Sequence, residues 1–477
     1  MEREVGVVAH ENGNLNRLES TEMFEVYGVF GMHRLADDSL LIITQELGFY
    51  KWYNDSIRKL PDFNSTPLSE LGIYGSLLLS DGDLALNSFT NGLVIADVDG
   101  NIKRKIDRSF GIRSNLVQYI YQDRDLNLWL ALENGISKVN YHSPLSYFND
   151  KTGVEGNVQA IIGFKDNIYI GTSSGLFIKN DGLYGTRRFV NTDVVKDQIW
   201  DFEIVENTLF VATANGIYKT NDGKNFIQVN REQTNTIVYR ENRKDFIIGG
   251  PRGIFVYDNR FNDKWSYTYN FSTFFNGEID PTNDSIIWLG TTKSGVLRLV
   301  EDPEEGFIID MYGYIDGLLD DLGKPMIYND SLIFGAKDGL FYFVNEDIMR
   351  EDLKDQLTAE ELADPAFTKG IFEPYVLNDS LFKGQFLLLE KGEDRIWYCN
   401  EFKIGYYDHV TKEFKNRPFW GIDYGRINKF YLEEDGVLWI GAAEGLIRYE
   451  KNNLKKYESH FYSLIRRVEL TKGDTIV

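Results

Sequence analysis

The amino-acid sequence predicts an all-β fold of tandem β-propellers, and three observations lead to this fold class. A phrase of about ten residues recurs along the chain, consisting of an apolar strand, a polar turn, a glycine and a second strand. Its period falls in the 40–50 residue range that is typical of four-stranded propeller blades. Aromatic residues make up 14% of the chain, which suits β-sheet. The 43 glycines and 10 prolines exclude a fibrous or disordered chain.

The turn glycines give the spacing of the repeats. Ten copies can be aligned at about 42 residues per blade, and a partial copy precedes them around Gly6. Neighbouring glycines lie 37 to 44 residues apart up to Gly339, but in the ninth copy Lys403 stands where a glycine is expected. The glycines of the other nine copies are Gly48, Gly92, Gly135, Gly175, Gly216, Gly253, Gly295, Gly339 and Gly445.

Each copy makes physical sense as a hairpin whose two faces are both buried. In the last copy, Leu438 and Ile440 point to one face of a strand and Trp439 points to the other. Apolar residues on both faces predict a blade with a neighbour on each side. Gly441 shares the face of Trp439 and leaves room for that neighbour, and Gly445 supplies the positive φ that the turn needs. We therefore assign these residues to blade architecture and not to catalysis.

Composition limits the class of partner. The net charge is −22 over 477 residues, and such an acidic surface repels nucleic acid and anionic membranes. Cys399 is the single cysteine, so no intramolecular disulfide can form, and its place in a strand predicts a buried, inert thiol. No signal peptide and no membrane-spanning stretch is visible.

The number of copies is too high for one propeller of four to eight blades, so we expect two in series. We place the first, N-terminally incomplete, at residues 1–235 and the second at 236–455, with residue 275 as an alternative boundary. Met349, Leu353 and Leu357 form a helical stripe, which predicts a helical insertion at about 345–365. Residues 456–477 read as a connecting strand that begins a further module, and both ends of the chain look cut.

Few segments suggest chemistry. The five histidines do not lie at metal-ligand spacing, and residues 123–127 imitate a calcium loop but lack its glycine and terminal glutamate. Residues 219–226 resemble a degraded Asp-box turn, which is a folding element. No phosphate-binding loop, GxSxG or ATP-site motif is present. We therefore expect no catalytic residue, no metal site and no cofactor.

One segment is crowded with rings and cations, and it precedes the inner strand of the last blade. Phe419, Trp420, Tyr424 and Arg426 are the candidate ligand-binding residues, because aromatic faces stack on sugars and arginine pairs with carboxylates. Ordinary packing between blades is the alternative interpretation of the same residues.

Residues 111–136 are similar to the two-component regulator propeller repeat. Gly111, Asn115, Val117, Asp123, Asn127, Leu128, Trp129, Gly135 and Ile136 match its pattern, while Leu132 replaces the usual threonine. The copies that begin at Gly153 and end at Gly445 match similarly. The tail from Tyr462 resembles the start of a triple-tyrosine module, an Ig-like β-sandwich. Lys403, the helical insertion and the cut ends depart from the pattern.

The resemblance implies a non-enzymatic sensor region in the periplasm. In such proteins the triple-tyrosine module connects the propellers to a membrane helix and an output domain, often a histidine kinase, and in glycan-sensing members the ligand is an oligosaccharide. The expected partners are a small molecule, an oligosaccharide or a protein, and the chain is expected to form a homodimer. A propeller glycoside hydrolase or lyase and a protein-interaction scaffold are the alternatives.

Overall fold

The structure is a computed structural model, and its described residues are almost entirely β-strand. The only helices among them are short: η1 (Glu22–Glu25), α1 (Leu68–Leu71), η2 (Arg108–Phe110) and η6 (Arg417–Phe419). None of these helices has the length and apolar character needed to cross a bilayer. The described residues are 6–11, 13–44, 47–60, 68–181, 187–268, 274–293, 295–313, 316–318, 323–336, 339–344, 371–375, 388–400, 403–421, 424–451, 468–469 and 475–476.

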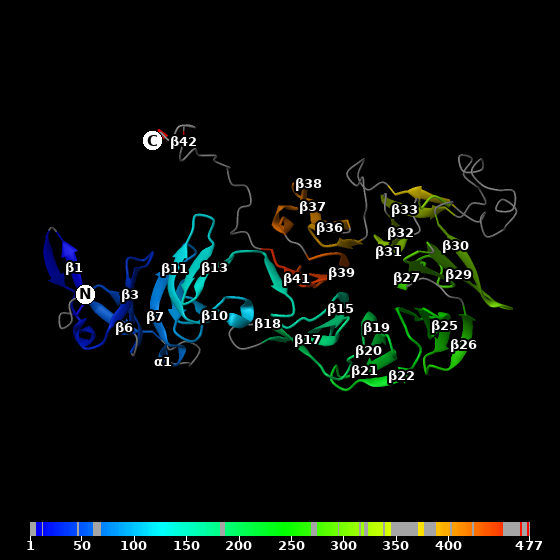
Figure 1. The fold of residues 1–477 in the computed structure, drawn as a ribbon, viewed down its shortest axis with the longest axis horizontal. Helices are drawn as coiled ribbons and strands as arrows, with labels where there is room; N and C mark the ends of the chain where they lie inside the picture. The colour runs from blue at the N-terminus through cyan, green and yellow to red at the C-terminus, as the bar shows by residue number, and fades with distance from the viewer. Residues whose placement is uncertain are drawn as a thin grey trace.

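Residues 145–449 form a closed ring of seven antiparallel four-stranded sheets, which we call blades one to seven (Figure 1). Blades one to three are β15 (Val158–Phe164), β16 (Asn167–Thr172), β17 (Gly175–Asp181) and β18 (Arg187–Asn191); β19 (Ile199–Val205), β20 (Thr208–Thr213), β21 (Gly216–Thr220) and β22 (Ile227–Asn230); and β23 (Thr236–Arg240), β24 (Asp245–Gly250), β25 (Gly253–Asp258) and β26 (Asp263–Thr268). Blades four and five are β27 (Phe274–Ile279), β28 (Ile286–Thr291), β29 (Val296–Asp302) and β30 (Gly306–Tyr312); and β31 (Lys324–Tyr328), β32 (Ser331–Ala336), β33 (Gly339–Val344) and β34 (Ile371–Pro374). Blades six and seven are β35 (Leu388–Lys391), β36 (Arg395–Asn400), β37 (Lys403–Asp408) and β38 (Glu413–Lys415); and β39 (Ile427–Leu432), β40 (Leu438–Ala442) and β41 (Gly445–Tyr449), completed by β14 (Leu145–Phe148).

The ring closes because its first and last strands share one sheet. The order β14-β41-β40-β39 places the strand that enters the ring beside the strand that ends it. Leu145 pairs with Tyr449 and Phe148 pairs with Leu446. Blade seven therefore takes its outer strand from one end of the ring sequence and its other three strands from the opposite end.

The N-terminal part forms an arc of three sheets that leads into the ring (Figure 1). The third sheet has only three strands, since β14, the next strand along the chain, pairs in the ring. Before the arc, β1 (Val8–Glu11) and β2 (Asn14–Arg17) pair with each other after Gly6. The arc consists of β3 (Val29–Arg34), β4 (Leu40–Thr44), β5 (Gly48–Tyr53) and β6 (Ser56–Lys59); β7 (Ile73–Leu78), β8 (Leu84–Ser88), β9 (Leu93–Ala96) and β10 (Ile102–Ile106); and β11 (Val117–Gln122), β12 (Leu128–Leu132) and β13 (Gly135–Val139).

The all-β class and the ten repeats are confirmed, because every aligned copy forms the second and third strands of a sheet, three in the arc and seven in the ring. Residue 235 falls between β22 and β23, inside the closed ring, and residue 275 lies within β27. The strand pairing instead puts the division between Val139 and Leu145. The repeats continue across this point without a change of spacing, which is why the spacing could not locate it.

Two expectations concern residues that are described only in part. The helical insertion at about 345–365 lies outside the described residues. In the tail, only β42 (Val468–Glu469) and β43 (Thr475–Ile476) are described, and they pair with each other. The triple-tyrosine module remains a prediction.

The hydrophobic core is divided among the seams between neighbouring blades. Trp439 is fully buried and contacts Phe148 and Phe189, whose ring centroids lie 5.9 and 5.6 Å away. A Cβ on Gly441 would lie 2.7 Å from Val158 of blade one, so glycine is needed where the blades meet. Cys399 is also fully buried, as expected, in the seam between blades six and seven.

Candidate functional site

Blade six departs from the other blades at its outer strand. Elsewhere the outer strand runs beside most of the third strand, as in blade three, where β26 pairs with β25 from Gly253 to Tyr257. In blade six, β38 pairs only with Tyr406, Tyr407 and Asp408 of β37. The first half of β37 therefore has no partner strand on that side among the described residues. The 3-10 helix η6 packs against β37 instead.

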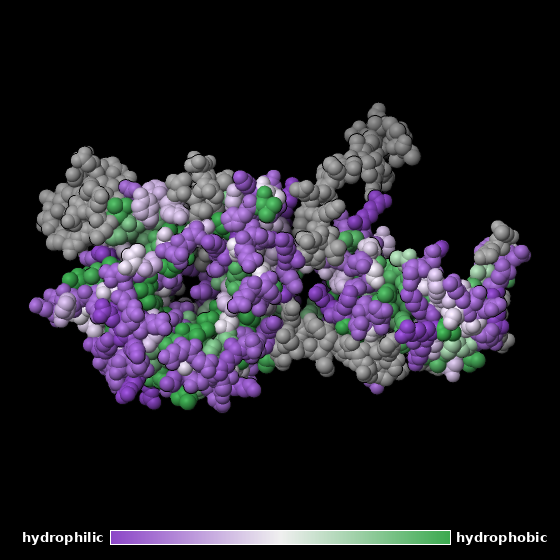
Figure 2. Space-filling view, turned by 180° about the vertical axis from the view of Figure 1, so that it is seen from behind, coloured by the Kyte–Doolittle hydropathy of each residue, from purple (hydrophilic) through white to green (hydrophobic). Residues whose placement is uncertain are grey.

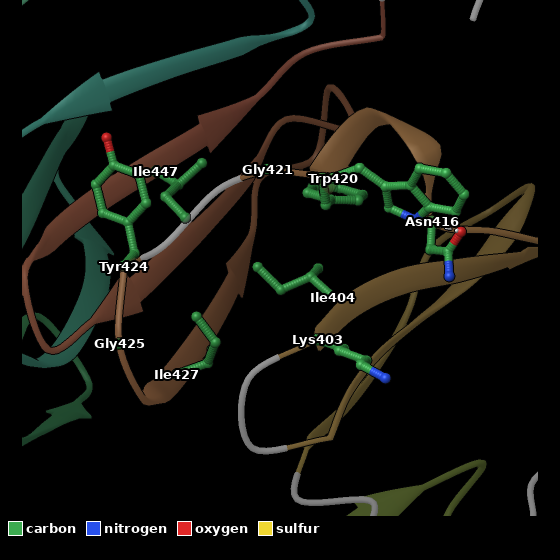
Figure 3. A pocket seen from close by; sticks show the side chains of 10 residues that line it. Lys403, Ile404, Asn416, Trp420, Gly421, Tyr424, Gly425, Ile427 and Ile447 are labelled. Atoms are coloured by element: carbon green, nitrogen blue, oxygen red, sulfur yellow. Dashed lines mark hydrogen bonds between the residues drawn. The ribbon is translucent and has the colours of Figure 1, made fainter.

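This replacement leaves a cleft of about 510 Å³ between blades six and seven, which we call the Trp420 cleft. Figure 3 shows Tyr424 and Trp420 on opposite sides of it, with the aliphatic side chains of Ile404, Ile427 and Ile447 between them. The cleft is lined by Lys403, Ile404, Asn416, Phe419, Trp420, Gly421, Tyr424, Gly425, Ile427 and Ile447.

Trp420 presents its ring to solvent from one wall of the cleft. Its side chain is 69% exposed, which is unusual for the largest apolar side chain. The indole N–H donates to Oδ1 of Asn416 at 3.0 Å, which holds the orientation of the ring. An exposed, oriented indole face is suited to stacking on a flat or ring-shaped ligand.

Tyr424 forms the other wall and is fixed from behind. Its ring stacks on Tyr147 of β14 with 5.1 Å between centroids and 8° between planes. The backbone carbonyl of Tyr424 accepts a hydrogen bond from the amide of Glu444 at 3.1 Å. Burial, assisted by the nearby carboxylate of Glu444, raises the pKa of Tyr424 to about 12, so its hydroxyl remains protonated and can donate.

The four residues expected from the sequence therefore have different environments. Trp420 and Tyr424 face each other across the cleft, while Phe419 is buried at its back and stacks on Tyr449 at 5.6 Å. Arg426 is exposed and does not line the cleft. It directly precedes β39, the inner strand of blade seven.

Lys403, which stands in place of the expected turn glycine, was not a predicted site residue but lines the cleft. In blade three, a Cβ on the corresponding Gly253 would lie 2.0 Å from the carbonyl oxygen of Tyr267 in the outer strand. The outer strand of blade six does not reach Lys403, so a long side chain fits there and lies at the edge of the cleft. The lost glycine was the sequence signal for an opened blade.

The cleft combines two aromatic walls, an aliphatic floor, one lysine and one amide. Its described lining residues include no carboxylate. Glycoside hydrolysis generally requires a pair of carboxylates about 5–10 Å apart, so the described lining offers stacking and hydrogen bonds in place of acid–base chemistry. Such a surface can bind a polar ring.

Charged residues of both signs line the inner strands around the centre of the ring, where Figure 2 shows a small opening. Asp201, Lys324 and Lys429 share one repeat position, opposite Ala212, Gly335 and Gly441. Two residues further along, Glu203, Glu278 and Glu390 lie opposite Phe210, Trp288 and Trp397. The inner strands thus carry charged side chains at two successive positions along the axis of the ring.

Burial dominates the ionisation of these groups. It raises the pKa of Glu203 to about 8, assisted by repulsion from Asp201 and Glu278. It raises the pKa of Glu278 to about 7, although Lys429 opposes the shift. It lowers the pKa of Lys324 to about 7, assisted by Lys429. Groups from four blades influence one another, so the inner strands hold them within electrostatic reach across the centre.

The turns that resembled ligand sites are internally satisfied. The carboxylate of Asp123 accepts hydrogen bonds from the amides of Asp125 and Asn127 at 3.0 and 2.8 Å, as a turn requires. Asp222 does the same for Lys224 and Asn225, at 2.9 and 2.8 Å. The described residues contain no group of three or more histidine, cysteine or acidic side chains placed to share one metal ion.

Two solved structures of extracellular domains are similar to this chain to different degrees. The extracellular domain of the hybrid two-component system BT3049 from B. thetaiotaomicron superposes with a TM-score of 0.60 at 15% identity, over 94% of this chain and 59% of that domain. The corresponding domain of BT4673 from the same organism gives 0.47 at 15% identity, over 96% of this chain and 63% of that domain. This chain therefore spans about 59% of the length of the first domain. No family model and no curated protein matches the sequence.

Proposed function

We propose that this chain is the ligand-recognition part of an extracytoplasmic sensor of the two-component type, and that the Trp420 cleft binds an oligosaccharide. The observation that carries the ligand class is the pair of facing rings, Trp420 and Tyr424, over an aliphatic floor. Sugar rings have apolar faces that stack on aromatic side chains and hydroxyl rims that accept and donate hydrogen bonds. Asn416, Lys403 and the Tyr424 hydroxyl supply such partners.

The sensor role is supported by the fold it shares with an extracellular two-component domain and by the position of Tyr424. Tyr424 stacks on Tyr147, and Tyr147 belongs to β14, the strand that leads from the arc into the ring. A ligand that fixes Tyr424 therefore acts on the element that joins the arc to the ring. A shift of the arc relative to the ring is the movement that this contact would transmit.

The test is calorimetric titration of the purified chain with pooled plant and host oligosaccharides. A saturable heat with fixed stoichiometry is expected, and Trp420→Ala should remove it. Tyr119→Ala is a matched control, because Tyr119 is 68% exposed and lies in the arc. Heat that continues in proportion to protein would indicate hydrolysis and would overturn the sensor assignment, and binding that survives Trp420→Ala would move the site elsewhere.

A further inference from the structure

A second cleft lies in the same seam between blades six and seven, at the opposite ends of the strands. It has a volume of about 800 Å³ and is formed by the turns that join the first and second strands of the two blades. We call it the acidic cleft, because seven of its lining residues are acidic and three are basic. The acidic residues are Glu390, Glu393, Asp394, Glu433, Glu434, Asp435 and Glu450, and the basic ones are Lys391, Arg395 and Lys451.

Part of this charge is used within the protein. Asp394 accepts two hydrogen bonds from the guanidinium of Arg395 at 2.8 and 2.7 Å and pairs with Lys451 at 2.9 Å. Asp435 accepts from the amide of Val437 at 3.1 Å.

Glu433 accepts from the indole of Trp439, and Glu450 pairs with Arg448. Two carboxylates of the acidic cleft, Glu393 and Glu434, have no hydrogen bond or ion pair with any described residue. Glu390 lies on the inner strand of blade six, where burial raises its pKa and the positive charge of Lys429 opposes the shift. The acidic cleft therefore has carboxylates that are free to meet a cation.

An unpartnered donor points into the same cleft. Trp397 is 1% exposed, lines the cleft, and its indole N–H has no acceptor among the described residues. At the same repeat position, the indole of Trp439 donates to Glu433 at 2.5 Å and that of Trp129 donates to Asp123 at 2.8 Å. The buried indole of Trp288 in blade four, like that of Trp397, has no acceptor among the described residues.

In blade six, the turn position that supplies the acceptor to Trp439 and Trp129 in their sheets holds a glycine. Gly392 is the first residue of its turn, and its amide donates to the carbonyl of Arg395 at 2.9 Å. The amides of Glu433 and Asp123 make the same turn bond, so Gly392 occupies the position of the acidic acceptors in those sheets. A Cβ at Gly392 would lie 3.7 Å from the indole nitrogen of Trp397, so the acceptor is missing directly beside the donor.

The donor and the carboxylates together select a ligand class. The carboxylates are too dispersed to share one metal ion, so a compact cation does not match them. Ammonium groups would meet the carboxylates, and a hydroxyl or ether oxygen would accept from Trp397. The volume exceeds what one sugar ring fills. We propose that the acidic cleft binds an oligosaccharide of amino sugars through their ammonium groups and one ring oxygen or hydroxyl.

The decisive probe is a pair of ligands with the same sugar backbone, one with ammonium groups and one in which each nitrogen is acetylated and neutral. Titration of the chain with a glucosamine tetramer at pH 6.5 should give saturable binding that weakens at least tenfold between 0.05 and 0.5 M salt. The N-acetylglucosamine tetramer has the same backbone without ammonium groups and should bind at least tenfold more weakly. Equal binding of the two tetramers, or no binding of the charged one, would overturn the proposal.

Two variants separate the charge from the donor. The double variant Glu393→Gln, Glu434→Gln should weaken glucosamine tetramer binding at least fivefold, while Glu413→Gln on the exposed β38 should not. Gly392→Glu supplies the acceptor that Glu433 provides in blade seven, and it fits because the Cβ contacts are ordinary and the backbone is not left-handed. Although it adds negative charge, it should weaken binding severalfold, and Gly392→Ala should not.

Tighter binding by Gly392→Glu would show that charge alone is recognised and would remove Trp397 from the site. Trp420→Ala should leave glucosamine tetramer binding unchanged. If Trp420→Ala abolished binding of the glucosamine tetramer, the amino sugar would bind in the Trp420 cleft, and the assignment to the acidic cleft would be overturned. These variants therefore distinguish failure of the proposal for the Trp420 cleft from failure of the proposal for the acidic cleft.

Discussion

Leu145 lies opposite Tyr449 in neighbouring antiparallel strands, so the first strand of the ring is hydrogen-bonded to the last. This pairing turns a row of blades into a closed structure that has no free sheet face along its circumference. Because the ring closes through the four-residue strand β14, the packing between blades seven and one depends on this strand. The contribution of this seam to stability can be tested directly.

Phe148→Ala should open that seam. Phe148 is 4% exposed and packs on Phe189 at 5.2 Å and on Trp439 at 5.9 Å. Removing a buried phenylalanine lowers the free energy of unfolding by about 3–5 kcal/mol. Denaturant unfolding followed by tryptophan fluorescence measures the loss. Tyr119→Ala, at an exposed site of the arc, should cost less than about 0.5 kcal/mol. Equal losses in the two variants would contradict a closure through β14.

Substitution of the turn glycine should be costly in blade seven but not in blade six. Gly445 has φ +135°, and a Cβ there would lie 2.3 Å from the carbonyl oxygen of Phe148. Gly445→Ala should therefore lower stability by about 1–3 kcal/mol. Lys403→Gly should change it by less than about 1 kcal/mol, since no outer strand crowds Lys403. Thermal unfolding compares the two, and a larger loss for Lys403→Gly would show that blade six is not open.

Tyr147→Ala should weaken ligand binding in the Trp420 cleft without removing a residue that lines it. Tyr424 would lose its stacked partner, and such a pair contributes about 0.5–1.5 kcal/mol, which corresponds to roughly a 2- to 12-fold change in Kd. Tyr147→Phe keeps the ring and should bind normally. Titration with an oligosaccharide found in the initial screen gives both constants. Unchanged affinity in Tyr147→Ala would show that β14 does not support the ligand-binding position of Tyr424.

Stability should fall as pH rises from about 4.5 toward 8, because the pKa of Glu203 is about 8 in the folded protein against 4.5 as the ordinary value. In that range the unfolded chain releases a proton that the folded chain retains, so ionisation favours unfolding. Lys324, with a pKa of about 7 against 10.5, acts in the opposite sense above pH 7.

Glu203→Gln should therefore stabilise the protein at pH 8 by roughly 1–3 kcal/mol and change little at pH 4.5. Unfolding midpoints measured from pH 4.5 to 8 would give a shallower slope for this variant. The exposed Glu206→Gln provides the control. A parallel shift of the whole curve would show that Glu203 does not titrate in this window.

Asp245→Asn should be among the most destabilising polar substitutions in the ring. Asp245 is fully buried and accepts from two nitrogens of Arg240 at 2.9 Å each, as well as from Lys264 at 2.6 Å. Loss of this charge leaves the buried Arg240 with Glu301, at 3.1 Å, as its remaining counter-ion. Breaking a buried pair by removing one partner costs up to about 3–5 kcal/mol. Asp263→Asn, on the exposed β26, should cost less than about 0.5 kcal/mol. Chemical denaturation distinguishes the two, and similar values would mean that the pair is neutral.

Local patterns in the sequence predicted local structure well. The alternation around Trp439 and the glycine at 445 correctly gave a hairpin buried on both faces, since these features depend on neighbouring residues alone. The closure of the ring depends on contact between segments at its two ends, Leu145–Phe148 and Gly445–Tyr449, which no local pattern records. The boundary near residue 235 followed from blade counting without that contact.

The candidate site was only partly predictable for a similar reason. The crowd of rings at Phe419, Trp420 and Tyr424 was visible, but their directions depend on the shortened outer strand, which turns Phe419 inward and Trp420 outward. Lys403 gave a signal through the glycine it replaces. The acidic cleft gave no signal in the sequence. Its residues come from two turns and the end of β41, and the position that lacks an acceptor is a glycine, Gly392.

The predicted homodimer stays a prediction.

The two clefts have one wall in common. Phe419 closes the Trp420 cleft from behind, Trp397 closes the acidic cleft, and their ring centroids are 6.2 Å apart. A ligand that displaces one of these two rings would therefore also displace the other, because the two rings are in contact. Linkage requires that any change the first ligand makes in the affinity for the second be returned in equal measure. Occupancy of one cleft would then change the affinity of the other, so the seam would respond most strongly when both sugars are present.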